Sequence, residues 1–164
     1  MKPFSFSVIG LPAPKGSKSA FVVPGKGKKG DPDYKAPRAV VTDKPAHGTS
    51  DRLGEWKIAV SAAMQAALIE RKDAEGWEPL DGALVCSVTF YLPRPASTPL
   101  SVRFPTKKPD ADKLTRAVWD ICSRNVWADD ARITTALISK RFAIGSPGMT
   151  LTVWPEPMED DRLI

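Results

Sequence analysis

Four aspartates stand in two close pairs, Asp110 with Asp112 and Asp129 with Asp130, on either side of a short amphipathic segment. Carboxylates held near one another repel, and burial strengthens the repulsion, so such a cluster usually holds either a proton or a cation. A ligand set made only of oxygen atoms suits hard divalent ions. The two pairs therefore predict a Mg²⁺ site, which Mn²⁺ would also fit.

Each of these acids also has an ordinary structural interpretation. An aspartate before a helix is a common N-cap, Asp112 and Arg116 have the spacing of a helical ion pair, and Asp-Asp is frequent in turns. For one acid alone the structural interpretation is the stronger. Two pairs that flank one helix, in a chain of net charge +5, favour the metal site.

The segment between the pairs has the periodicity of a helix with one apolar side. Pro109 forces an extended approach, so Asp110 is expected at or just before the first turn. The predicted apolar side holds Leu114, Ala117, Val118, Ile121 and Cys122, and the predicted polar side holds Asp112, Arg116, Trp119, Asp120 and Ser123. Because the second pair follows the helix and opens a strand, both pairs are expected to meet at one end of this helix–strand unit.

The same region resembles the RusA family of Holliday junction resolvases, in particular its phage and prophage members. The resemblance rests on the run PDADKLTR at residues 109–116, followed by Asp120, Trp127, Asp129-Asp130 and Lys140. Residues 10–16 also resemble the opening strand and Pro-rich loop of that family. This resemblance implies a single RusA-like domain that cleaves branched DNA in recombination and repair, works as a homodimer and acts in the bacterial host cytoplasm.

The resemblance also implies roles for individual residues. Asp110, Asp112 and Asp130 are expected to hold the Mg²⁺ and to act in catalysis, and the motif aligns Asp130 rather than Asp129. The family has a lysine with a suspected catalytic role where this chain has Arg116. A guanidinium keeps its proton at any working pH, so Arg116 is expected to act as a fixed cation.

The charge of the chain is uneven. Residues 1–50 hold nine Lys and Arg against three Asp, a balance of +6, so the remainder carries −1. A basic front half joined to an acidic cluster suggests a polyanionic partner such as DNA, although a solubilising basic surface gives the same count. The residues expected to contact phosphates are Lys15, Lys18, Lys26, Lys28, Lys29, Lys107, Lys108 and Lys140.

The order of predicted elements gives one α+β domain over residues 1–164, with a mixed sheet and helices packed on one face. Strands are predicted at 4–11, 83–92, 133–144 and 149–154, and a helix from Ser50 or Asp51 to about Lys72. The turn at 145–148 predicts that the last two strands form a hairpin. Residues 12–50 are expected to be a long basic loop with short strands near 21–23 and 39–41. Residues 93–109 form a second basic loop, and the acidic tail at 156–164 is expected to fray.

Several function classes are disfavoured by composition. No apolar run reaches the length of a membrane span, and the first residues lack a signal-peptide pattern. Cys86 and Cys122 lack metal-ligand spacing and are predicted to be buried, reduced thiols, and His47 is given no role. Two alternatives to a resolvase stay open: a nucleic-acid-binding module without catalysis, and a different phosphoryl-transfer enzyme with similar carboxylate spacing.

Overall fold

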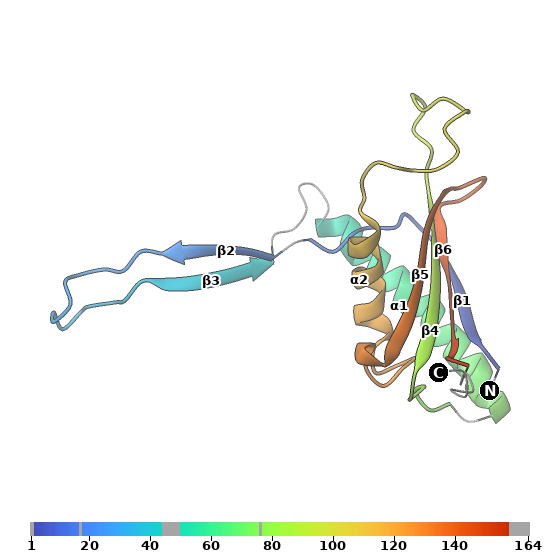
Figure 1. Ribbon diagram of the computed structural model, residues 1–164, viewed down its shortest axis with the longest axis horizontal. Helices are drawn as coiled ribbons and strands as arrows, with labels where there is room; N and C mark the ends of the chain where they lie inside the picture. Colours follow the sequence, from blue (N-terminus) through green and yellow to red (C-terminus); the bar gives the residue numbers. More distant parts are fainter. Residues whose placement is uncertain (1, 17, 44–49, 76, 158–164) are drawn as a thin grey trace, which may run out of the picture.

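A four-stranded sheet carries both long helices on one face, and a two-stranded ribbon projects from this body (Figure 1). The computed structural model describes residues 2–16, 18–43, 50–75 and 77–157. Its elements are β1 (Phe4–Ile9), β2 (Lys18–Val23), β3 (Arg38–Asp43), α1 (Ser50–Glu75), β4 (Leu84–Leu92), α2 (Ala111–Cys122), the 3₁₀ turn η1 (Asp130–Arg132), β5 (Ile133–Phe142) and β6 (Gly148–Pro155). The α+β class and the mixed sheet predicted from the sequence are confirmed.

The sheet has the order β1-β6-β4-β5, with β4 and β5 parallel and the other pairs antiparallel. Buried and exposed side chains alternate along its strands, which gives the sheet two different faces. In β1, Phe4, Phe6 and Val8 are buried while the residues between them are exposed, so one face meets the helices and the other meets solvent. Because β5 lies at the edge of the sheet, only one of its sides pairs with another strand among those that the structure describes.

The predicted hairpin between the last two strands is wrong. The chain does reverse after β5, but β4 lies between β5 and β6 in the sheet. The connection crosses the end of β4, where Ala143 N donates to Leu92 O, and it reaches β1, where Gly10 N donates to Pro147 O. Gly148 starts β6 so close to β1 that a Cβ there would lie 2.1 Å from Val8 O. Turn residues predict that the chain reverses direction, but they do not predict which strands become neighbours in the sheet, because that depends on packing.

The long basic segment after β1 contains more order than its composition predicts. β2 and β3 pair antiparallel over six residues each, and Lys26 and Lys35 form a further bridge beyond them. The short strands expected near 21–23 and 39–41 are therefore confirmed and are longer than expected. Figure 1 shows this β2–β3 arm standing away from the sheet and helices.

Both helices bury an apolar side, and in α2 it is the side predicted from the sequence, with Ile121 only partly buried. In α1 the buried residues are Trp56, Val60, Met64 and Leu68, and in α2 they are Leu114, Thr115, Ala117, Val118 and Cys122. Trp119 was predicted on the polar side of α2 but is partly buried against the core. It lies one helical turn from the buried residues Thr115 and Cys122, so its large ring reaches the core from the edge of the apolar side. Its indole packs edge-on against Trp127, with ring centroids 6.2 Å apart.

Some predictions fall outside the described residues, among them those for His47 and for the end of the acidic tail from residue 158 onward. Among the residues that are described, no helix combines the length and apolarity that a membrane crossing requires.

Candidate active site

The first acidic pair stands at the N-terminal end of α2. Asp110 occupies the N-cap position in an extended conformation, but its side chain makes no capping hydrogen bond with the described backbone. Its Oδ2 instead lies 3.1 Å from Lys113 Nζ. Asp112 is exposed in the first turn, where the positive end of the helix dipole favours a negative charge. Asp110 therefore has a cationic partner on its own helix, whereas Asp112 has none among the ion pairs of the described residues.

The second acidic pair divides into two different environments. Asp129 Oδ1 accepts a hydrogen bond from Ala131 N at 2.8 Å and so caps the short η1 turn. Asp130 is half-buried, and its Oδ1 accepts a hydrogen bond from Trp127 Nε1 at 2.7 Å. A capping role explains Asp129, whereas Asp130 is held rigidly by an indole. The two aspartates of this pair therefore have different surroundings, although they are neighbours in the sequence.

The two pairs do not meet, which contradicts the expectation that they share one end of the helix–strand unit. Asp110 is the N-cap before α2, while Asp130 lies between the end of α2 and the start of β5. Twelve helical residues span about 18 Å at 1.5 Å per residue. Accordingly, no group of three or more His, Cys, Asp or Glu side chains within the described ranges lies close enough to hold a metal ion. A helix cannot fold back on itself, so the acids at its ends stay apart.

Two neutral thiols lie near Asp130. Burial raises the pKa of Cys86 to about 12 and also raises the pKa of Cys122, and the charge of Asp130 adds to both shifts. Both cysteines are free and buried, as the sequence predicted. Protonated thiols are poor ligands for hard cations, so the carboxylate oxygens remain the donors to consider.

Arg116 lies one turn after Asp112 on the exposed side of α2, as the helical spacing predicted. The ion pairs among the described residues do not include one between Arg116 and Asp112, so the ordinary helical pair is not formed. The guanidinium is therefore free to meet an anion near the first acidic pair.

The predicted phosphate contacts have diverse surroundings. Lys26, Lys28 and Lys29 are exposed at the tip of the arm, and Lys107 and Lys108 are exposed before α2. The side chain of Lys18 lies outside the described residues. Lys15 Nζ is 2.6 Å from Asp120 Oδ2, and the amide of Lys15 donates to Lys113 O, so this lysine ties the loop after β1 to α2.

Lys140 has an internal role that the sequence did not suggest. Its Nζ donates to Lys107 O at 3.0 Å and to Pro109 O at 2.9 Å. Two hydrogen bonds from β5 thus hold the backbone that delivers Asp110 to α2. The hydrogen bond from Trp127 to Asp130 was not predicted from the sequence either, although the spacing of three residues is a signal from which it could have been inferred.

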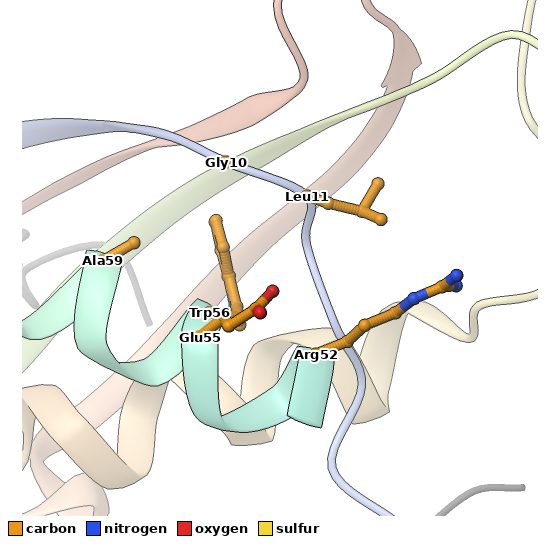
Figure 2. Close-up of a pocket in the computed structure, with 6 residues that line it drawn as sticks. All are labelled: Gly10, Leu11, Arg52, Glu55, Trp56 and Ala59. Atoms are coloured by element: carbon orange, nitrogen blue, oxygen red, sulfur yellow. The ribbon is translucent and has the colours of Figure 1, made fainter. Parts of the chain in front are cut away.

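A surface hollow of about 280 Å³ lies elsewhere, between the end of β1 and the first turns of α1. Its lining consists of Gly10, Leu11, Arg52, Glu55, Trp56 and Ala59. Figure 2 shows Trp56 rising from α1 toward the backbone at Gly10, with Arg52 and Glu55 at the rim. None of the four aspartates contributes to it, so the candidate chemistry lies on the open surface around α2.

Comparison with known families decides what this arrangement belongs to. The family model of the endodeoxyribonuclease RusA matches residues 33–153. The chain belongs to the RusA endodeoxyribonuclease family. The match contains both acidic pairs and begins inside the arm, so β1 and β2 precede it. No curated protein matches the chain.

Membership of the RusA family makes the chain a nuclease of the Holliday junction resolvase class, with branched DNA as its substrate. RusA resolvases generally depend on a divalent metal ion. The three carboxylates that the motif marks, Asp110, Asp112 and Asp130, have the donor chemistry for such an ion. In a single chain, Asp110 and Asp112 lie at one end of α2 and Asp130 lies at the other.

The two hydrogen bonds from Lys140 to the backbone before Asp110 should contribute measurably to stability. Lys140→Met removes both hydrogen bonds from a charged donor but keeps the aliphatic stem, so it should lower the free energy of unfolding by about 2 kcal/mol. The salt dependence of junction affinity should stay unchanged, because the ammonium faces the protein. The exposed neighbour Lys108 is the matched control, since Lys108→Met should leave stability unchanged and reduce the salt slope by about one unit. Urea unfolding and binding titrations at several salt concentrations measure both quantities. An unchanged stability with a reduced slope for Lys140→Met would return Lys140 to the phosphate contacts.

Proposed function

We propose that this chain is a magnesium-dependent Holliday junction resolvase that works as a homodimer, with each active site built from two copies. It would serve DNA recombination and repair in a bacterial cytoplasm, where free, buried cysteines stay reduced. Manganese fits the same oxygen donors. The observation that carries the proposal is the separation of the acids in a chain of the RusA family, because a complete site then needs a second copy.

The edge of the sheet supports a specific way for two copies to meet. β5 is an edge strand of ten residues that pairs with β4 on its inner side, and near its midpoint Leu137 and Ile138 are 53% and 39% exposed. Long edge strands with exposed apolar residues favour pairing with another strand. Antiparallel pairing of β5 with its copy about a two-fold axis near Leu137 and Ile138 would bring the start of one strand to the end of the other. Asp130 of one copy would then lie beside Asp110 and Asp112 of the second.

Each residue has a distinct part in the proposed reaction. Asp110 and Asp112 of one copy and Asp130 of the other would hold the cation, and Trp127 would fix the orientation of Asp130. A bound divalent cation supplies an activated water and offsets the charge on the scissile phosphate. Arg116, one turn from Asp112, would stabilise the negative charge that develops on the phosphate oxygens. Two equivalent sites in a two-fold dimer match the two symmetric cuts that resolution requires.

Binding would depend on cations that lie far from the cut. The arm carries Lys26, Lys28 and Lys29 near its tip, and a two-stranded ribbon is narrow enough to follow a DNA groove. Lys107 and Lys108 would hold the backbone next to Asp110. Such contacts read charge and shape rather than sequence, as a resolvase that recognises a branch requires.

The shared site predicts a complementation result. Asp112→Asn or Asp130→Asn alone should abolish cleavage and spare junction binding, since each removes a charged ligand without changing size. A mixture of the two variants forms mixed dimers in which one site has both lesions and the other has none. We therefore expect the mixture to recover strand cutting, with one strand cut per binding event.

Single-turnover cleavage of a labelled four-way junction, with and without Mg²⁺, measures this recovery. A mixture of Asp110→Asn with Asp112→Asn is the control, because both lesions affect the same half-site and no intact site can form. If the mixture of Asp112→Asn and Asp130→Asn stayed as inactive as this control, sites shared between copies would be refuted. A variant Asp112→Asn that cut at the parental rate would instead favour a binding module without catalysis at these acids.

Arg116 is expected to act through its charge alone. Arg116→Ala should lower the single-turnover rate about a hundredfold, the effect typical of deleting one preorganised donor to a developing anion. Arg116→Lys should keep most of the rate, because the positive charge survives. Saturating protein excludes binding defects from this measurement. A parental rate for Arg116→Ala would make Arg116 an ordinary surface cation.

The arm is expected to supply affinity rather than catalysis. Changing Lys28 and Lys29 together to Gln should weaken junction binding and lower the slope of log affinity against log salt by about two units. The matched control is Lys2→Gln with Lys57→Gln, two lysines on the body outside the proposed contacts. Fluorescence anisotropy at several salt concentrations gives both slopes. Equal slopes for the two double variants would exclude the arm from DNA binding.

A further inference from the structure

The loop between β4 and α2, residues 93–109, exposes an apolar tip close to the first acidic pair. Leu100 is 85% exposed, Phe104 is 53% exposed and Val102 is 38% exposed. Figure 1 shows this loop extending beyond the sheet at the end where α2 begins. Exposing apolar side chains to water costs free energy, so their presence together on one loop points to a contact that covers them.

The loop is held in shape although it contains neither helix nor strand. Arg94 donates to Pro99 O at 3.1 Å and to Val102 O at 2.9 Å. These two hydrogen bonds connect the start of the loop to the residues at its tip. The guanidinium of Arg141 lies 4.9 Å from the ring centroid of Phe104 and anchors it to β5. At the end that precedes α2, the loop is held by the two hydrogen bonds from Lys140 to Lys107 O and Pro109 O. An apolar tip on such a loop is preorganised, which lowers the entropy lost on binding.

The charge around the tip identifies the chemistry of the partner. Residues 93–109 contain four cations and no acid, and Arg141 adds another cation from β5. An anionic partner is therefore favoured, whereas the same loop of a second copy would bring like charges together. In a chain of the RusA endodeoxyribonuclease family the anionic partner is DNA, and DNA covers apolar side chains where its base faces are open. Closed duplex hides those faces, but the centre of a branched junction can present them.

We propose that Leu100 and Phe104 form a wedge that enters the branch point and stacks against bases which the wedge separates. This inference rests on the proposed function and extends it to how the substrate is recognised. The wedge supplies preference for a branch over a duplex, while the surrounding cations hold the phosphates. Its position next to Asp110 and Asp112 sets the distance between the separated bases and the strand to be cut.

The test uses a four-way junction that carries 2-aminopurine at its branch point, since this base fluoresces more strongly when it is unstacked. Without divalent ions, which prevents cutting, the parent chain should raise the fluorescence on binding. Leu100→Ala with Phe104→Ala should abolish that rise and weaken junction binding about tenfold, while affinity for duplex stays unchanged. The matched control is Ile58→Ala with Ile69→Ala on α1, where the side chains are 72% and 60% exposed, and this variant should behave as the parent does.

Each other outcome has a definite meaning. A parental fluorescence rise and affinity in the double variant would overturn the wedge and leave the resolvase function standing. A parent chain that neither binds nor cuts the junction would overturn both. If sedimentation shows that the double variant dissociates into monomers, the tip is a contact between copies and the wedge is wrong. Should the double variant fail to fold, Leu100→Ala alone carries the same test, because that side chain is almost fully exposed.

Discussion

The length of α2 governs what one chain can do alone. A straight helix of twelve residues keeps its ends about 18 Å apart, and the acids of the RusA motif are divided between those ends. The helix cannot bend to bring them together, because Leu114, Val118 and Cys122 bury its inner side against the sheet. Flexibility of single side chains cannot close such a gap. In the proposed dimer a second copy, running in the opposite direction, would close this gap by pairing along the edge strand β5.

Local patterns predicted the elements well and their neighbours poorly. Alternation in β1 and β4 and the apolar stripes of α1 and α2 depend on which side chains are buried, and burial leaves a periodic signal in the sequence. The partner of a strand leaves no such signal. Residues 145–148 reverse the chain as predicted, but β4 takes the position that a hairpin would give to β5. The prediction that the acids meet failed for the same reason, since residues near in sequence were assumed to be near in space.

The lysines illustrate a second limit of the sequence. Charge counts correctly identify the first fifty residues as basic, and Lys28 and Lys29 are exposed near the tip of the arm, as the proposed phosphate contacts require. The same counts cannot separate a lysine that faces solvent from one with internal partners. Lys15 pairs with Asp120, and Lys140 donates to two backbone carbonyls of the segment before Asp110. Both lysines thereby support the position of α2, which no tally of charge reveals.

The two half-sites also differ in how their charge is balanced. Asp110 has Lys113 nearby, and Asp112 benefits from the helix N-terminus. Asp130 is half-buried near two protonated thiols, and among the described residues its carboxylate receives one hydrogen bond, from Trp127, and no ion pair. A partly buried carboxylate with so little compensation gains most from a nearby cation. A second copy that delivers a cation held by its own Asp110 and Asp112 would supply that compensation. Metal binding and pairing of the copies would then stabilise one another, because each lowers the electrostatic cost of the other.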